Sequence, residues 1–283
     1  MIRVYFILTK PGIVLGNIIT TTAGFLLASK GHFDLYLFLA TVVGLALIIA
    51  SACVFNNAID KDADAKMGRT KDRPLAKGLI STKSALAFAL SIGLLGGYIL
   101  AVFTNVMTAL VALSGFVIYV VVYSLWKYHS TNATLIGSIA GAVPPVVGYL
   151  AVSNHFDAAA WILFAIVLLW QMPHFYAIAI YRLEEYAAAS IPVLPTTQGL
   201  FLTKISMLLY VIAFMVASLL LITYGYTGTG YMAAALILGF GWLALSFFGF
   251  KAEDNTRWGK QMFRYSLVVI TVLCLMISLD IAQ

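Results

Sequence analysis

Long apolar stretches recur along the whole chain and are separated by short polar segments. A membrane-spanning helix needs about 20 consecutive apolar residues, whereas a surface helix of a soluble protein alternates apolar and polar faces. Stretches of this kind cover residues 11–29, 34–58, 82–103, 106–125, 132–153, 158–181, 201–224, 230–250 and 262–281. The pattern therefore predicts an all-α polytopic membrane protein with nine transmembrane helices.

The composition agrees with this interpretation and excludes a soluble domain. Of the 283 residues, 62% are hydrophobic and only 10% are charged, whereas soluble chains carry about 25% charged residues. The length fits one membrane domain over residues 1–283. Cys53 and Cys274 both lie in apolar stretches, so no disulfide framework and no cysteine-based metal site is expected. No cleavable signal peptide is expected, because residues 1–10 are short and are followed by a full-length span rather than a small-residue cleavage site.

The basic residues predict the orientation of the bundle. Alternating spans place Lys30 alone on one side and the other 16 of the 17 Lys and Arg residues on the opposite side. The positive-inside rule then puts the N-terminus in the cytoplasm and the C-terminus outside. The net charge of +6 is thus an orientation signal, and no nucleic-acid partner is expected. A pseudo-repeat of helices 1–4 and 5–8, followed by helix 9, stays an open interpretation.

A stripe of oxygen-bearing side chains ends the second span. Asn56, Asp60 and Asp64 follow one another at intervals of four residues, which on an α-helix places them within an arc of about 80° and a length of about 12 Å. Asp62 points away from that arc. Such a stripe suits Mg²⁺, which takes one or two carboxylates and shares its other positions with water and substrate phosphates. The following basic residues, Arg69, Lys71, Arg73 and Lys77, provide positive charge for a phosphate-bearing ligand. A solvated face beside the membrane is the alternative interpretation.

Further polar residues occur in the sixth span. Helical spacing places Gln171, His174, Arg182 and Glu185 within about 80° of one another. Polar side chains on one stripe of a membrane helix usually face a protein interior or a cavity. Two consecutive prolines, residues 144 and 145, predict a bend or break in the fifth span.

Acids and cations at the mouth of an apolar bundle match a ligand with a diphosphate head and a hydrocarbon tail. Mg²⁺ on the stripe and the neighbouring cations would stabilise the charge of a departing diphosphate. Aromatic faces between the helices would stabilise an allylic cation. The reaction class that this arrangement indicates is prenyl transfer.

These residues also resemble a known family. The series Asn56-x₃-Asp60-x₃-Asp64, followed by Arg69-Thr70-x₂-Arg73-Pro74, is similar to the first aspartate-rich motif of UbiA-type intramembrane prenyltransferases. More narrowly, the chain resembles the heme O synthase (protoheme IX farnesyltransferase) branch. The segments that carry this resemblance are residues 9–12, 123–125, 134–138, 144–149, 170–175 and 191–195. The last three spans match only as hydrophobic segments.

The resemblance implies a specific reaction. Farnesyl diphosphate would alkylate a vinyl group of heme B, and water would then add, giving heme O for terminal oxidases. The implied enzyme is Mg²⁺-dependent, with Asn56, Asp60, Asp64, Arg69 and Arg73 as catalytic residues, and has a cytoplasmic-side cavity open laterally to lipid. It would lie in a bacterial inner membrane with its active site toward the cytoplasm. Heme A synthase and terminal-oxidase assembly are candidate partners.

The acceptor would bind beside the sixth span. Where many relatives have a second pair of aspartates, this chain has Glu184 and Glu185, and Glu185 is the best local substitute. Arg182 would pair with a heme propionate. His174 is either a ligand of the heme iron or a histidine that only hydrogen-bonds within the bundle. Other candidates near the acceptor are Gln171, Tyr181 and His129, and His129 is more readily explained as an anchor at the membrane surface.

Two other functions stay open at this point. A UbiA-type enzyme could instead prenylate a quinone precursor or another aromatic acceptor. A transporter of an anionic or lipidic solute shares the broken fifth span. Transporter sites lie near the middle of the bilayer, however, whereas the charges of this chain gather at one face.

Overall fold

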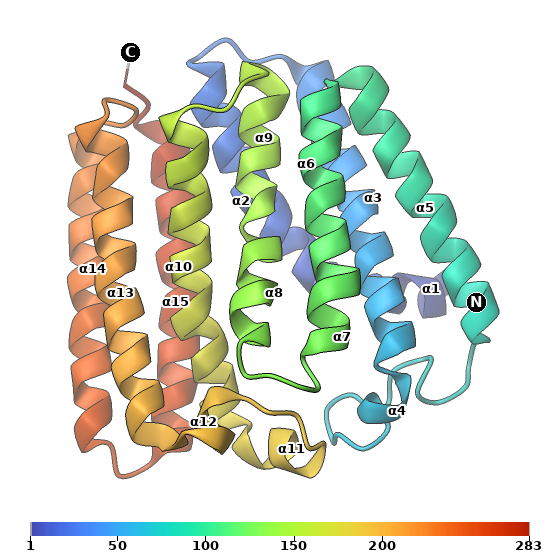
Figure 1. Ribbon diagram of the computed structural model, residues 1–283. Coiled ribbons are helices and arrows are strands. Elements are labelled where there is room, and N and C mark those ends of the chain that lie inside the picture. The colour runs from blue at the N-terminus through green and yellow to red at the C-terminus, as the bar shows by residue number, and fades with distance from the viewer. Residues whose placement is uncertain (1, 283) are drawn as a thin grey trace.

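Apolar helices build the entire molecule. The computed structural model describes residues 2–282, and within them nine helices are long and apolar enough to cross a membrane. They stand side by side in one bundle (Figure 1). The prediction of an all-α membrane protein with nine spans is confirmed.

The helices follow one another with short connections. They are α1 (Ile2–Leu8), α2 (Pro11–Ser29), α3 (Leu35–Ile59), α4 (Lys61–Asp64), α5 (Thr82–Phe103), α6 (Val106–Val117), a π-helix (Ile118–Tyr123), α7 (Ser124–Trp126), α8 (Ala133–Gly141), α9 (Val143–Ser153), α10 (Ala158–Tyr181), α11 (Leu183–Ala188), α12 (Leu194–Thr197), α13 (Gly199–Thr223), α14 (Thr229–Phe248), a 3₁₀ turn (Gly249–Lys251) and α15 (Asn255–Leu279). In Figure 1 the C-terminus lies at the top, and α4, α11 and α12 lie at the opposite end.

Most boundaries lie within two residues of the predicted ones, and the ninth span is the exception. α15 begins at Asn255, seven residues before the predicted start at residue 262. Its first turns carry Arg257, Lys260 and Gln261, which lower the local hydropathy, although an Asp254 side chain caps the helix there by accepting a hydrogen bond from the Arg257 backbone N–H. The helix therefore extends beyond the apolar stretch into the polar region.

The fifth span is broken, as its two prolines predict. α8 ends at Gly141 and α9 begins at Val143. Pro144 and Pro145 have no backbone N–H, so two carbonyl groups of the preceding turn lose their helical donors. Gln171 of α10 donates one hydrogen bond to the carbonyl oxygen of Ser138 at this break. That carbonyl oxygen also accepts from the Ala142 backbone N–H at 3.0 Å, so Gln171 connects α10 to the break without replacing a donor that the prolines remove.

Helices α2 and α9 pack closely against each other. Gly24 lies against the backbone of Pro145, and Gly148 lies against the backbone of Thr21. Small residues at these crossings let two helices approach closely inside a membrane. Since α2 follows directly on residue 10 and α9 directly on α8, this contact fixes the N-terminal segment relative to the broken span.

Candidate functional site

The predicted oxygen stripe is real and lies at the end of α3. Asp60 caps α3, and α4 continues with helical hydrogen bonds, from the Asp60 N–H to the Asn56 carbonyl at 2.9 Å and from the Asp64 N–H to the Asp60 carbonyl at 2.8 Å. Asn56, Asp60 and Asp64 are only 3%, 6% and 5% exposed, whereas Asp62 is exposed. The spacing therefore predicted correctly which side chains share a face. Their role as metal ligands stays a prediction.

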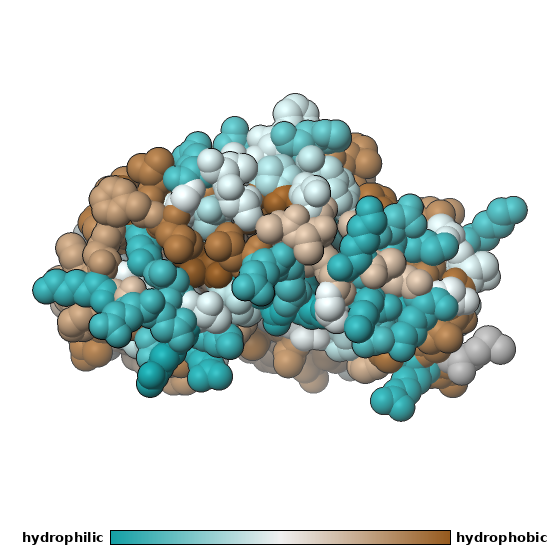
Figure 2. Space-filling model, turned by 90° about the horizontal axis from the view of Figure 1, so that it is seen from below, coloured by the Kyte–Doolittle hydropathy of each residue, from teal (hydrophilic) through white to brown (hydrophobic). Residues whose placement is uncertain are grey.

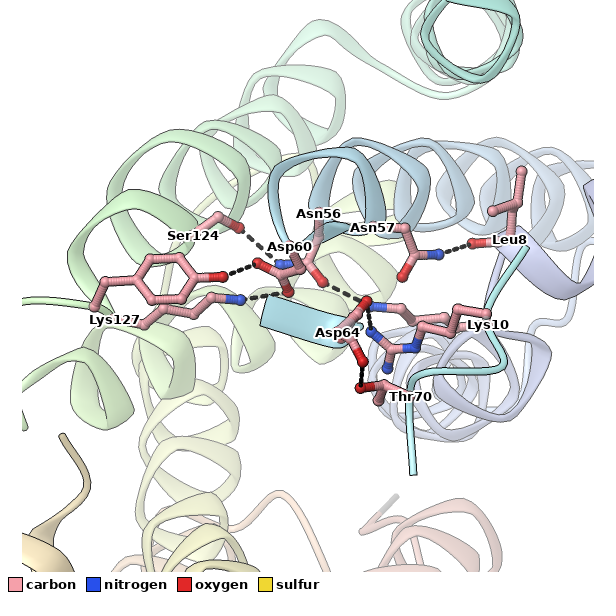
Figure 3. Close-up of polar contacts among 11 residues, drawn as sticks. Leu8, Lys10, Asn56, Asn57, Asp60, Asp64, Thr70, Ser124 and Lys127 are labelled. Carbon is pink, nitrogen blue, oxygen red and sulfur yellow. Dashed lines mark hydrogen bonds and ion pairs between the residues drawn. The ribbon is translucent and has the colours of Figure 1, made fainter. Parts of the chain in front are cut away.

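Each oxygen-bearing side chain of the stripe is held by a cation (Figure 3). The Lys127 ammonium donates to Asp60 Oδ2 at 2.5 Å, and the Arg73 guanidinium donates to Asp64 Oδ2 at 2.6 Å. Lys10 Nζ donates to Asn56 Oδ1 at 2.6 Å. Three cations thus meet two carboxylates and an amide. The surplus positive charge favours a polyanionic ligand.

Two of these cations were not among the predicted site residues. Lys10 and Lys127 lie 46 and 67 residues away in sequence from the side chains that they bind. Burial lowers the pKa of both ammonium groups, while the Asp60 carboxylate opposes the effect, and the pKa of Lys10 falls to about 8. Lys10 therefore still carries its charge for most of the time at neutral pH.

A π-helical turn positions the end of the fourth span against the stripe. Residues 118–123 form this turn between α6 and α7, and such turns occur frequently at functional sites. The Ser124 hydroxyl donates to the Tyr119 carbonyl at 2.9 Å and accepts from Asn56 Nδ2 at 3.0 Å. Beyond it, the Tyr128 hydroxyl donates to Asp60 Oδ1 at 2.8 Å. The residues that follow the π-helical turn therefore connect the fourth span directly to Asn56 and Asp60.

The other predicted phosphate-binding cations are exposed. Arg69, Lys71 and Lys77 all lie on the surface of the segment between α4 and α5. Lys77 forms a 2.6 Å ion pair with Asp72, which lowers the pKa of that carboxyl group. Lys77 therefore turns toward its own loop in this structure, whereas Arg73 alone of the predicted basic residues contacts the stripe. Figure 2 shows this end of the molecule, where hydrophilic residues gather in separate groups with apolar surface between them.

The predicted acceptor residues of α10 contact two different neighbouring helices. Gln171 Nε2 donates to the carbonyl oxygens of Ser138 and Val167, so it belongs to the α8 contact. His174 lies against α15, where its Nδ1 is 2.7 Å from Ser266 Oγ. His129 is exposed, as a surface anchor would be. Gln171 and His174 are three residues apart on the continuous α10 and stay within the predicted arc, but they contact different neighbouring helices.

Arg182 and Glu185 form a pair at the end of α10. α10 ends at Tyr181 and α11 begins at Leu183, so helical spacing does not extend from the span to these residues. The Arg182 guanidinium donates to Glu185 Oε1 at 2.6 Å and lies 5.1 Å from the centre of the Tyr181 ring. Burial raises the pKa of the nearby Tyr186 hydroxyl, and the positive charges of Arg69 and Arg182 oppose that rise.

The donor set of the stripe fits Mg²⁺. Among residues 2–282 no three His, Cys, Asp or Glu side chains lie close enough to hold a metal alone. Two buried carboxylates and one amide oxygen are nevertheless the hard ligands that Mg²⁺ uses when substrate phosphates complete its shell. Neither of the two hollows described in residues 2–282, of about 220 Å³ beside α6, α9 and α10 and about 370 Å³ at the start of α15, is lined by the stripe or by His174.

The fold and the site define a class of protein: a multi-pass integral membrane protein with buried acids and cations at one end of its bundle. A model of the UbiA prenyltransferase family matches residues 17–268. The chain belongs to the UbiA prenyltransferase family.

Curated relatives are similar over the whole chain. The protoheme IX farnesyltransferase of Protochlamydia amoebophila is 52% identical over 100% of both chains. That of Edwardsiella ictaluri is 50% identical over 99% of this chain and 95% of its own.

Solved structures agree in fold. A digeranylgeranylglyceryl phosphate synthase has a TM-score of 0.82 at 17% identity and covers 98% of this chain and 97% of its own. A UbiA homologue from Archaeoglobus fulgidus, bound to GPP and Mg²⁺, has a TM-score of 0.68 at 13% identity, with 97% and 99% covered. These identities support the fold and no finer conclusion.

Proposed function

We propose that this protein transfers a farnesyl group from farnesyl diphosphate to a vinyl group of heme B, with addition of water, and so forms heme O. The observation that carries the proposal is the buried stripe of Asn56, Asp60 and Asp64, held by Lys10, Lys127 and Arg73. The identity of about 50% to protoheme IX farnesyltransferases over the full chain supports heme as the acceptor.

The residues of the site have separate tasks in this reaction. Asn56, Asp60 and Asp64 would hold Mg²⁺, which would supply positive charge at the diphosphate. In this proposal the phosphate oxygens replace the stripe as the partners of three cations, the ammonium groups of Lys10 and Lys127 and the guanidinium of Arg73. The diphosphate then supplies the negative charge that Asp60 and Asp64 supply in the ligand-free protein. These preorganised cations lower the barrier to departure of the diphosphate.

The bond changes balance without a redox partner. The C–O bond of farnesyl diphosphate breaks, and the electron pair leaves with the diphosphate. The π electrons of the heme vinyl group form the new C–C bond to the allylic carbon. Water then adds to the resulting cation and loses one proton, leaving a hydroxyethylfarnesyl group.

The site is proposed to face the cytoplasm of a bacterial inner membrane. In this orientation Lys10, Lys127 and the segment between α3 and α5 lie on the side with the excess of basic residues. Farnesyl diphosphate would reach its head-group site from that side while its tail lies among apolar helices.

The test is turnover of the purified protein with farnesyl diphosphate, heme B and Mg²⁺, with products identified by mass spectrometry. We expect heme O from the wild type, loss of activity with a chelator, and recovery with added Mg²⁺. Asp60→Asn and Asp64→Asn should each lower kcat/KM by at least ~100-fold, the scale of losing one electrostatic contact in a transition state. Asp62→Asn is the matched control, because Asp62 is exposed beside the stripe.

Two results would overturn the proposal. One is full activity of Asp60→Asn in the presence of Mg²⁺. The other is a farnesylated aromatic quinone precursor, with no farnesylated heme, when both acceptors are offered.

A further inference from the structure

Ser266 of α15 receives two side chains from α10. The indole N–H of Trp170 donates to the Ser266 carbonyl oxygen at 2.8 Å. His174, one helical turn further along α10, places its Nδ1 2.7 Å from the Ser266 hydroxyl oxygen. Ser266 is fully buried and His174 is 8% exposed. This buried contact fixes the imidazole relative to both helices.

The hydrogen count at Ser266 determines which nitrogen of His174 carries the proton. The Ser266 hydroxyl has one hydrogen and lies 2.6 Å from the Phe263 carbonyl oxygen, which can only accept. If that hydrogen bonds to Phe263, the hydroxyl oxygen is left as an acceptor, and Nδ1 of His174 must donate. If the Ser266 hydroxyl instead donated to Nδ1, its oxygen and the Phe263 carbonyl oxygen would lie 2.6 Å apart without a hydrogen between them. The contacts therefore favour the neutral imidazole with Nδ1 protonated and Nε2 unprotonated.

Aromatic rings hold the imidazole plane. His174 stacks on Trp170 with 4.7 Å between ring centres and an angle of 28° between planes, and it lies 4.9 Å from Phe263. Within residues 2–282, Nε2 forms no hydrogen bond. Fully enclosed side-chain atoms without a partner also occur in this part of the chain, but Nε2 is not among them. Nε2 is thus the ring nitrogen without a partner among the described residues, whereas Nδ1 and the ring faces are occupied.

We propose that Ser266 is a positioning residue that holds His174 as the Nδ1–H tautomer, so that its Nε2 binds the iron of the heme acceptor. Neutral imidazole binds a metal through one nitrogen while the other nitrogen donates to a fixed oxygen, which sets the tautomer and the ring orientation. The inference rests on the proposed function for the identity of the acceptor. The tautomer itself is a property of the protein without any ligand.

The first experiment reads the tautomer directly in the ligand-free protein. The chain has four histidines, and the other three, His32, His129 and His155, are all exposed. Replacing these three with Gln leaves His174 as the one ¹⁵N-labelled histidine in lipid bilayers. We expect one protonated nitrogen, coupled to the ring as Nδ1, and one unprotonated Nε2 at neutral pH. A spectrum with Nε2 protonated would overturn the proposal whatever the enzyme's substrate is.

The second experiment measures heme binding. Wild-type protein titrated with heme B should show the Fe–His stretching band in resonance Raman spectra, and His174→Ala should lose it. Ser266→Ala should weaken heme affinity by ~10-fold, the usual effect of removing the hydrogen-bond partner of a metal-binding histidine, and should shift the Fe–His band. Ser266→Thr keeps a hydroxyl oxygen and should restore both.

A matched control separates this role from general packing. Ser218 is also a buried serine that donates to a carbonyl of its own helix, at 2.8 Å, and has no histidine partner. Ser218→Ala should leave the heme spectrum unchanged, and Ser266→Ala should leave the binding of farnesyl diphosphate unchanged. An unaltered Fe–His band in Ser266→Ala would overturn the inference while wild-type turnover still supports the proposed function. Failure of the wild type to bind heme would instead overturn both, even with the expected tautomer.

Discussion

At the scale of single residues, each buried carboxylate of the site is paired with a cation. The side chains of Asp60 and Lys127 are 9% and 12% exposed and meet at 2.5 Å. A buried carboxylate without its cation is strongly unfavourable, whereas an exposed ion pair contributes little. The ligand-free protein therefore depends on Lys127 for stability, and a divalent ion at Asp60 can take over that task.

Lys127→Met should lower the thermal unfolding midpoint markedly, because it leaves the Asp60 carboxylate with Tyr128 as its one remaining hydrogen-bond donor among the described side chains. Removing one partner of a buried pair costs about 3–5 kcal/mol. Mg²⁺ should raise the midpoint of Lys127→Met more than that of the wild type. Thermal unfolding in detergent, with and without Mg²⁺, measures both effects.

Lys77→Met is the matched control for this experiment. Lys77 also forms a 2.6 Å ion pair, but its side chain and that of Asp72 are 50% and 64% exposed. Its loss should change the midpoint little, since exposed pairs contribute about 0–1 kcal/mol. Equal midpoints for Lys127→Met, Lys77→Met and the wild type would contradict the assignment of a buried ion pair to Asp60.

The residue scale also shows what the sequence can predict. The face shared by Asn56, Asp60 and Asp64 follows from local helical spacing, and the structure confirms it. Lys10 and Lys127 depend on contacts between distant spans, which no local pattern contains. A usable signal was present, because Lys127 follows an apolar span that ends on the same predicted side as Asp60.

At the scale of helices and turns, the proline break was predictable and the side-chain contacts around it were not. Two consecutive prolines interrupt any helix, but only the packed structure shows that the Gln171 amide serves the Ser138 carbonyl rather than an acceptor site. The π-helical turn before Ser124 and the end of α10 at Tyr181 likewise depend on tertiary contacts. These features shift which side chains face one another, so spacing arguments fail beyond each of them.

The α2–α9 crossing yields a prediction at the same scale. Gly24→Ala should destabilise the protein by about 1–3 kcal/mol, the usual cost of overpacking, because the new Cβ would overlap the Pro145 backbone. Gly16→Ala, two turns earlier on α2, meets nothing within 4 Å and should leave stability unchanged or raise it slightly, since Ala favours a helix over Gly. Chemical denaturation in detergent measures both, and equal stability of the two variants would contradict the close crossing.

At the scale of the whole molecule, the charge distribution and the bundle geometry together predict how the protein is oriented in the membrane. An odd number of spans puts the two termini on opposite sides, and the C-terminus does lie at the opposite end from α4, α11 and α12 (Figure 1). The end with the stripe also carries the basic segment between α3 and α5. The positive-inside rule therefore predicts that this end faces the cytoplasm.

Labelling of single cysteines in intact cells tests that orientation. The two native cysteines are buried, so a membrane-impermeant maleimide should react little with the wild type. His32 and Lys83 are both exposed. His32 follows the first span at the end predicted to lie outside, and Lys83 begins the third span at the end predicted to lie in the cytoplasm. His32→Cys should be labelled in intact cells, and Lys83→Cys only after the membrane is permeabilised. The reverse pattern would place the stripe on the outer face and would contradict the proposed entry of farnesyl diphosphate from the cytoplasm.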